Sequence, residues 1–256
     1  MLYRCPWRMM LAACAALAPG CGKIEKPQAD AGADAPIGSS DPVDATPGNP
    51  DAIDGPVGDA PPADAGPPAA IALVTGDTTA QFGDGASEWA VDPCPTGQAL
   101  ISFSGATGPL GTVGNIVYEV QGRCGAIHVG AAATGGYATT ATPGVLLAVR
   151  GTTTTTTWTL SCPSDQFVVG LSGRYGTAID QLALQCAAVS LIHGDTGWTG
   201  QIGAISLSDA QGGSGGNVHA QPCTAGQIAT SAHIWGPADK SAVHGLGLGC
   251  SVVTAQ

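Results

Sequence analysis

The sequence predicts an all-β domain with threefold internal symmetry and one disulfide in each repeat. One unit is written three times, at residues 89–124, 158–186 and 218–250. The first cysteines of the copies are 68 and 61 residues apart, at Cys94, Cys162 and Cys223. The second cysteines are 62 and 64 apart, at Cys124, Cys186 and Cys250. A fixed period of this kind indicates an architecture built from repeated units.

The cysteines are expected to form one bond within each copy. Of nine cysteines, Cys5, Cys14 and Cys21 fall within or at the end of an apparent export signal, which leaves two per repeat. An even number at regular spacing in an exported chain indicates disulfides, and no CxxC pair typical of zinc sites occurs. Six cysteines allow 15 pairings, of which the repeat favours Cys94–Cys124, Cys162–Cys186 and Cys223–Cys250.

The strands are clearest in the second repeat. Residues 167–171 form a β-branched run, residues 173–176 are expected to turn, and a second strand starts at Ile179. Apolar residues then alternate with small or polar ones, as in a half-buried strand. The alternating apolar positions are Leu182, Leu184 and Cys186, matched by Leu246, Leu248 and Cys250 in the third repeat. The first repeat offers Ile116, Tyr118 and Val120, with Cys124 four residues further on. No segment beyond the signal has a helical apolar period.

The N-terminus, residues 1–21, has the features of an export signal. Arg4 and Arg8 precede a short apolar stretch that ends in small residues before Cys21. The stretch 17–21 resembles a bacterial lipobox, which implies that Cys21 is lipidated and becomes the mature N-terminus. The stretch 11–14 matches a lipobox better residue by residue but leaves a very short apolar region. Cys21 is therefore favoured, Cys14 is the alternative, and a plain secretory signal is a third interpretation.

Residues 22–70 are predicted to be a disordered linker. Between positions 27 and 68 the chain carries eight aspartates, ten prolines and no lysine or arginine. Such a segment buries too little apolar surface to fold, and its like charges and prolines keep it extended. It resembles the acidic spacers of bacterial surface lipoproteins, which implies a place in the cell envelope, at the outer membrane or cell surface.

The remaining residues, 71–256, suffice for one β domain with a real core, with repeats at about 73–130, 145–192 and 205–253. This domain carries ten acidic residues and only four basic ones. A net charge of about −6 argues against nucleic acid as a partner, because nucleic-acid binding needs a basic face.

Two known families resemble the repeat. The pattern Cys-Pro-x-Gly at 94–97, with a later alternating strand that ends in cysteine, resembles the vitelline membrane outer layer protein I repeat. Residues 168–180 (VVGLSGRYGTAID) resemble the strand–turn–strand signature of jacalin-type lectins. Both families have the β-prism I fold, in which three Greek-key sheets surround a pseudo-threefold axis, so the resemblance implies that fold here.

The lectin resemblance implies one candidate carbohydrate site. Its first half is the GxxxD turn, here Gly176, Thr177, Ala178 and Asp180, in which the aspartate accepts hydrogen bonds from sugar hydroxyls while turn amides donate. Its second half, in griffithsin-like lectins, is a GGSGG loop that opens the next repeat. The matching loop residues are Gly212, Gly213, Ser214, Gly215 and Gly216.

The sequence also departs from the lectin pattern. No aromatic residue follows Gly176, so no ring is available there to stack on a sugar. At the aspartate position we expect Asn115 in the first repeat and His244 in the third. The first repeat's counterpart of the glycine-rich loop is expected to be only residues 83–85 (GDG). At most one complete site is therefore predicted, and the alternative role for Asp180 is to cap its own turn.

Other chemistry finds little support. The separations of His219, His233, His244 and Asp239 match no metal-ligand spacing, and Ser172 does not lie in a GxSxG motif. Trp89 and Trp158 precede the first cysteines at similar offsets, which predicts a packing role. We therefore predict no catalytic residues, no metal and no cofactor. The functional hypothesis is a surface-anchored lectin-like lipoprotein that binds glycans or cell-surface polysaccharide. The alternative is a structural or protein-adhesion module that binds no sugar.

Overall fold

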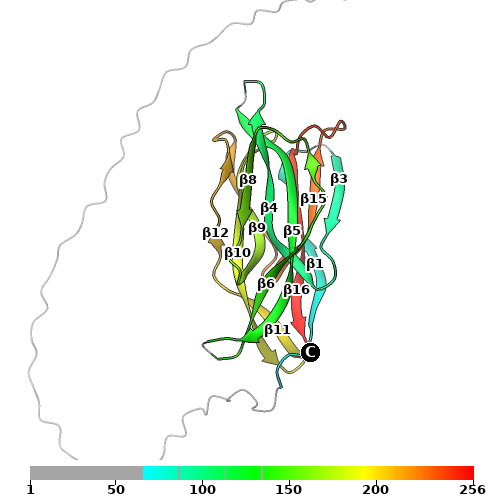
Figure 1. The fold of residues 1–256 in the computed structure, drawn as a ribbon, viewed down its shortest axis with the longest axis vertical. Coiled ribbons are helices and arrows are strands. Elements are labelled where there is room, and N and C mark those ends of the chain that lie inside the picture. Colours follow the sequence, from blue (N-terminus) through cyan, green and yellow to red (C-terminus); the bar gives the residue numbers. More distant parts are fainter. Residues whose placement is uncertain (1–65, 86, 113, 134) are drawn as a thin grey trace, which may run out of the picture. The chain divides into compact units, whose positions relative to one another are not determined.

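The computed structural model describes residues 66–256, except 86, 113 and 134. This part of the chain folds into sixteen β-strands without a helix (Figure 1), and so contains no helix that could cross a bilayer. The predicted signal peptide, with Cys14 and Cys21, and the linker as far as residue 65 lie outside the described residues.

Each repeat contributes one long antiparallel hairpin that starts a few residues after its first cysteine. In chain order the hairpins are β4 (Gln98–Pro109) with β5 (Asn115–Ala131), β9 (Gln166–Tyr175) with β10 (Ile179–Gly194), and β15 (Gln227–Gly236) with β16 (Gly245–Ala255). Their three turns lie at the end of the domain remote from the C-terminus, which we call the apex (Figure 1).

A shorter strand ends directly before each first cysteine and pairs with the hairpin of the preceding repeat. These exchanged strands are β8 (Thr156–Ser161), which pairs with β4, β14 (Asn217–Pro222), which pairs with β9, and β3 (Ser87–Pro93), which pairs with β15. Because β3 comes from the start of the domain and β15 from its end, the exchange closes the three repeats into a ring.

The other side of each hairpin is covered by a broken outer strand. It consists of β6 (Tyr137–Leu146) and β7 (Arg150–Gly151) beside β5; β11 (Gly197–Ile202), β12 (Ser206–Leu207) and β13 (Gln211–Gly212) beside β10; and β1 (Ile71–Thr78) and β2 (Phe82–Gly83) beside β16. The result is the predicted β-prism, with three sheets related by a pseudo-threefold axis. Short pairings of β6 with β10 and of β11 with β16 join neighbouring sheets.

The core is layered along this axis by residues at equal distances from the cysteines. Near the apex, one buried cluster unites Ile116, Ala178 and Ala242, each eight residues before a second cysteine. Towards the other end, Ala99, Phe167 and Ile228, each five residues after a first cysteine, are fully buried in another cluster. Each layer combines large and small side chains, so that unequal repeats fill one core.

The three predicted disulfides are all present. Cys94–Cys124, Cys162–Cys186 and Cys223–Cys250 join Cα atoms 5.7, 5.6 and 5.9 Å apart. Each bond ties the start of a hairpin to its returning strand. The predicted packing role of the two tryptophans is confirmed, since Trp158 is buried in the main core cluster and Trp89 packs against it.

Two predictions of local structure were wrong. The turn of the second hairpin lies at residues 176–178, not 173–176, because Gly173 is accommodated inside β9 with a φ of 139°. In the first repeat, Ile116 is buried in the apex cluster, but Tyr118 does not continue the core-facing row, because the register shifts there and Val117 enters the main core cluster instead. That row is Val120, Gly122 and Cys124, and Leu147 from the outer strand packs where Gly122 lacks a side chain.

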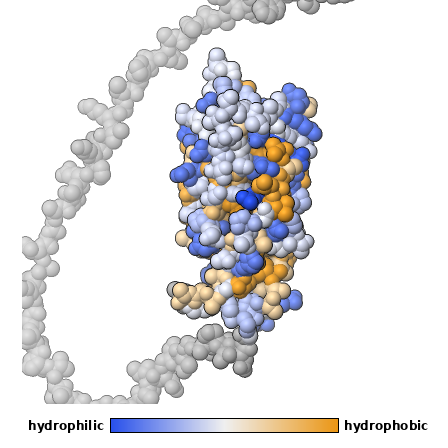
Figure 2. Space-filling view, viewed as in Figure 1, coloured by the Kyte–Doolittle hydropathy of each residue, from blue (hydrophilic) through white to orange (hydrophobic). Residues whose placement is uncertain are grey.

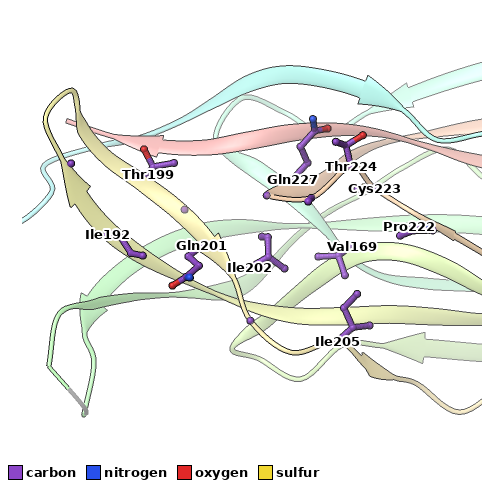
Figure 3. A pocket seen from close by; sticks show the side chains of 15 residues that line it. Val169, Ile192, Thr199, Gln201, Ile202, Ile205, Pro222, Cys223, Thr224 and Gln227 are labelled. Carbon is purple, nitrogen blue, oxygen red and sulfur yellow. The ribbon is translucent and has the colours of Figure 1, made fainter.

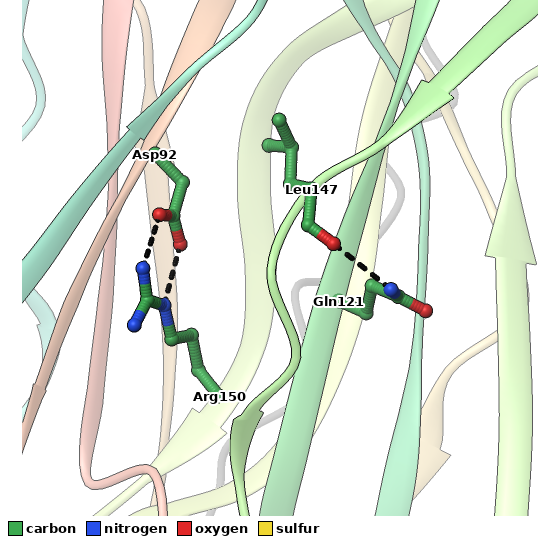
Figure 4. A network of polar contacts seen from close by, with 4 residues as sticks. All are labelled: Asp92, Gln121, Leu147 and Arg150. Carbon is green, nitrogen blue, oxygen red and sulfur yellow. Dashed lines mark hydrogen bonds and ion pairs between the residues drawn. The ribbon is translucent and has the colours of Figure 1, made fainter.

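The seam between the first and third sheets is held by a charged pair. Arg150 on β7 donates from Nε to Asp92 Oδ2 at 2.8 Å and makes a second bond to Oδ1 (Figure 4). Nearby, Gln121 donates to the carbonyl oxygen of Leu147 at 2.9 Å (Figure 4). The strand segment around this seam is apolar, since Val145, Leu146 and Val149 are each about half exposed. Figure 2 shows apolar residues gathered in the middle of one face.

Candidate functional site

The turn of the second hairpin brings Asp180 to the apex. Asp180 is the second residue of β10, and only 4% of it is exposed. The three turn residues play different parts: Gly176 and Thr177 are exposed, whereas Ala178 points into the buried apex cluster. The Gly176 amide donates to the carbonyl oxygen of Ala178 at 3.1 Å, which closes a tight turn.

The glycine loop, residues 212–216, folds directly over the Asp180 carboxylate. The Gly213 amide donates to the backbone oxygen of Asp180 at 2.6 Å. A Cβ atom on Gly215 would overlap Asp180 Oδ1, and one on Gly216 would overlap Oδ2. Gly216 also has a φ of 61°, a conformation that other residues rarely adopt. Glycine is therefore required at both positions for the loop to approach the carboxylate.

Arg174 fixes the loop in place. From β9, its guanidinium donates to the backbone oxygen of Gly215 at 2.8 Å through Nε and to that of Gly216 at 2.9 Å through Nη2. Both carbonyls are thus turned towards Arg174. The sequence motifs do not reveal this role of Arg174, although it is one of only four basic residues of the domain and lies two positions before the turn.

The electrostatics of Asp180 are set mainly by its burial. Burial raises the pKa of the Asp180 carboxyl above its ordinary value, while the nearby Gly176 amide and the charge of Arg174 act in the opposite direction. The charged carboxylate is therefore less solvated than an exposed aspartate. Any polar ligand group that reaches it would meet a strong hydrogen-bond acceptor.

An aromatic cluster flanks the site without offering a free ring face towards it. The Tyr175 ring stacks on His219 of the exchanged strand β14 at a centroid distance of 3.8 Å, and Phe82 of β2 meets it edge-on at 5.0 Å. The cluster instead braces β9 against two strands from other parts of the chain.

The counterparts of this site in the other repeats correct two expectations. Each second cysteine lies six residues after the position of Asp180, which makes His244 the counterpart in the third repeat, as predicted. In the first repeat the counterpart is Tyr118 rather than Asn115, because the first-repeat hairpin carries a longer turn. The backbone of Asn115 lies instead against Gly213, so it walls the second repeat's site.

The assignment of the loops changes as well. Gly83 pairs with Gly245 beside His244, so residues 83–85 serve the third repeat and not the first. The first repeat's loop begins at Gly151, which pairs with Glu119 beside Tyr118. Gly83 and Gly151, like Gly212, have a positive φ. They lie against the backbone oxygens of His244 and Tyr118, as Gly212 lies against that of Asp180. Each loop therefore packs on the hairpin of the preceding repeat, just as each exchanged strand does.

The other candidate groups do not assemble into a site. Among the described residues, no three His, Cys, Asp or Glu side chains gather closely enough to hold a metal ion. His233 pairs with Glu88 at 2.6 Å. Asp239 caps its own turn through the amide and hydroxyl of Ser241, and these bonds lower the pKa of its carboxyl.

Comparison with known proteins finds matches of low sequence identity among solved structures. No family model and no curated protein matches the sequence. Among solved structures, Calystegia sepium agglutinin is 13% identical over 68% of this chain and 95% of its own, with a TM-score of 0.40. Malaysian banana lectin is 13% identical, covering 70% and 99%, with a TM-score of 0.39. Artocarpin complexed with Me-alpha-mannose is 9% identical, covering 70% and 98%, with a TM-score of 0.41.

Proposed function

We propose that this β-prism domain binds a neutral carbohydrate at the apex of its second sheet, between the 176–178 turn and the glycine loop. One observation carries the proposal. Two short motifs that are about 35 residues apart in the sequence meet at one carboxylate, and a basic side chain holds them together.

The chemistry of this junction suits sugar hydroxyls. The carboxylate of Asp180 accepts only, while the exposed backbone of Gly176, Thr177, Ser214 and Gly216 offers polar groups around it. Neighbouring hydroxyls of one sugar unit can then donate to the carboxylate and accept from amides. An anionic ligand fits less well, because Arg174 is already committed to the loop and Asp180 repels anions.

The test is a glycan array on the full-length chain, followed by calorimetric titration with mannose-, galactose- and glucosamine-type sugars. We expect binding to one class, and a loss of at least tenfold in affinity for Asp180→Asn. Asp165→Asn is the matched control, since Asp165 is exposed in the turn before β9, at the other end of that strand. If wild type binds no sugar, or if Asp180→Asn binds as well as wild type, the proposal is wrong.

The burial of Asp180 favours one alternative, a structural or protein-adhesion module that binds no sugar. With 4% exposure, the carboxylate serves equally well as a cap that holds the turn and the glycine loop together. In that case Asp180→Asn lowers the melting temperature, and the array stays blank for wild type as well. Sugar binding by wild type on the array is therefore enough to distinguish the two functions.

We further propose that the domain is held at a bacterial surface by a lipid on Cys21. The support is the lipobox-like sequence and the acidic linker, together with the exit of the chain. Near that exit, the Ala69 amide donates to the Gln256 carbonyl at 2.6 Å, at the end opposite the apex. Labelling with an alkyne fatty acid tests the anchor: Cys21→Ala should lose the label and Cys14→Ala should keep it. The reverse pattern would assign Cys14.

A further inference from the structure

The prism has three related grooves, one at each junction between repeats. Each lies between an outer strand and the turn that follows the first cysteine of the next repeat, at Cys94, Cys162 and Cys223. Each is also lined by the residue seven positions after a first cysteine, namely Thr230, Ile101 and Val169. The three grooves can therefore be compared position by position, far from the apex.

They have diverged in size and charge. The Cys94 groove, of about 580 Å³, is lined by Asp77 and His233 among many hydroxyl groups. The Cys162 groove has closed to about 190 Å³ and contains Arg123. The Cys223 groove, of about 600 Å³, is the only one of the three without an acidic, basic or histidine side chain in its lining.

We infer that the Cys223 groove binds an uncharged, predominantly apolar small molecule that carries one or two hydrogen-bonding groups. Its volume falls within the range of small-molecule pockets, roughly 300–1,000 Å³. The complete lack of charge in its lining matches an uncharged ligand, on a domain that otherwise carries fourteen charged side chains. The two equivalent grooves show that the scaffold itself does not impose this lining.

The walls of the Cys223 groove are apolar where they face one another. Val169 on β9 and Ile202 on β11 lie on one side, and the turn from Cys223 to Gln227 on the other (Figure 3). At the mouth, Ile192 and Ile205 are 50% and 54% exposed, so two large aliphatic side chains meet water when the groove is empty. Covering them releases that water, which favours an apolar occupant.

The polar residues of the groove are divided between two tasks. Thr224 and Gln227 point away from Val169 and Ile202 (Figure 3) and are hydrogen-bonded to Asp77. Thr224 Oγ1 donates to Asp77 Oδ2 at 2.9 Å, and Gln227 Oε1 accepts from the Asp77 amide at 3.1 Å. This leaves Thr199 and Gln201, both exposed on β11, as the side chains that can orient a ligand.

The inference is independent of sugar binding and is tested with the uncharged fluorophore N-phenyl-1-naphthylamine on the full chain. We expect saturable fluorescence enhancement with one probe per molecule. Ile205→Asp, which puts a charge at the mouth, should weaken probe binding at least tenfold, and Ile205→Leu should not. Val218→Asp is the matched control, because Val218 is 70% exposed on β14 and lies outside the groove.

The other possible results are interpreted as follows. Probe binding that is absent in wild type, or equal in Ile205→Asp, overturns it. If Ile205→Asp does not fold, judged by its melting curve, Ile192→Asp on the opposite side of the mouth replaces it with the same expectation. A dimer in sedimentation that Ile205→Asp dissociates would assign the groove to a second copy instead. Asp180→Asn should leave probe binding unchanged, so that failure of the sugar proposal and failure of this one are separable.

Discussion

Asp180 shows at the scale of one residue how a symmetric scaffold acquires a single polar site. Its counterparts are Tyr118, whose hydroxyl donates to the carbonyl oxygen of Pro109 at 2.9 Å, and His244, which is partly buried. Only at Asp180 do a carboxylate and a long glycine loop coincide. The backbone beneath the three positions is the same, so the difference lies in side chains and loop length.

The raised pKa of Asp180 gives stability a defined dependence on pH. Because the pKa is higher in the folded state than the ordinary value of about 3.9, the folded protein takes up the proton more readily than the unfolded one. The contribution of Asp180 to stability is therefore greatest below that ordinary value and is lost as the pH rises through the folded pKa. Urea unfolding of wild type and Asp180→Asn should be compared at pH values from 3.5 upwards. As the pH rises, we expect the free energy of unfolding of the variant to increase relative to that of wild type. Curves that stay parallel would contradict the expectation.

Lys240 is the one described residue other than glycine with a positive φ, 57°. It lies in the exposed turn of the third hairpin, where a left-handed conformation costs a lysine roughly 1 kcal/mol. We expect Lys240→Gly to raise the free energy of unfolding by about 0.5–1 kcal/mol, which is roughly 1–4 °C in melting temperature for a domain of this size. The control is Ala238→Gly in the same turn, where φ is not positive. That change should destabilise the domain by a few tenths of a kcal/mol or more, and equal effects of the two changes would refute the role of φ.

The sequence predicts the residues of the apex site better than their surroundings. Asp180 and the glycine loop could be identified because each motif is local, with a recognisable spacing. Arg174, Tyr118 and the wall at Asn115 could not, because their roles depend on which segments of other repeats pack beside them. One-residue insertions in a turn change such neighbours without changing any motif.

At the scale of elements, the seams between sheets carry few specific contacts. The Asp92–Arg150 pair is the clearest, since it connects the exchanged strand β3 to β7 across sheets. The hydrogen bond to Asp92 raises the pKa of Arg150, which stays charged. The Asp92 and Arg150 side chains are only 12% and 30% exposed, so the pair is sheltered from much of the solvent screening that weakens surface ion pairs.

Removal of this pair should loosen the seam measurably. We expect Asp92→Ala and Arg150→Ala each to lower the free energy of unfolding by roughly 1–3 kcal/mol, because each leaves a partly buried charge unpaired. The double variant should lose less than the sum, with a coupling of about 0.5–3 kcal/mol. The measurement is a double-mutant cycle by urea unfolding, with Asp165→Ala as an exposed control expected within ±0.5 kcal/mol. Strict additivity would mean that the two side chains do not cooperate.

Strands were easier to predict than their partners. The hairpins after each first cysteine follow from alternation and from the turn residues, and the disulfides follow from the repeat. The exchanged strands were not predicted, because nothing in the local pattern of residues 156–161 tells which hairpin they join. Pairing between distant segments is decided by the whole ring, and so the loops at 83–85 were assigned to the wrong repeat.

At the scale of the whole molecule, the ring depends on strands from its two ends. Sheet three is assembled from β1, β2 and β3 at the start of the domain and β15 and β16 at its end. The first and last described segments meet there, through Ala69 and Gln256. The order of the repeats along the chain is therefore less important than their closure.

This closure predicts that the domain tolerates circular permutation but not deletion of its N-terminal strands. A circular permutant that joins Gln256 to Gly66 and opens after Ala133, between β5 and β6, should fold with all three disulfides and a cooperative melting curve. Deletion of residues 66–93 should abolish cooperative melting, because β15 and β16 would both lose their outer partners. Circular dichroism on heating measures both. Cooperative melting of the deletion at an unchanged temperature would show that sheet three does not need the N-terminal strands.

The exchange of strands also allows two molecules of this protein to swap strands with one another. Strand β3 pairs with the β15–β16 hairpin at the far end of the same chain, and the same hairpin of a second molecule presents an identical edge. No disulfide crosses the contact between β3 and β15, since all three bonds lie within repeats. When sheet three opens at high protein concentration, two chains can exchange β1–β3 and form a domain-swapped dimer. Every native contact is then kept, but β1–β3 of each chain pair with β15 and β16 of the other.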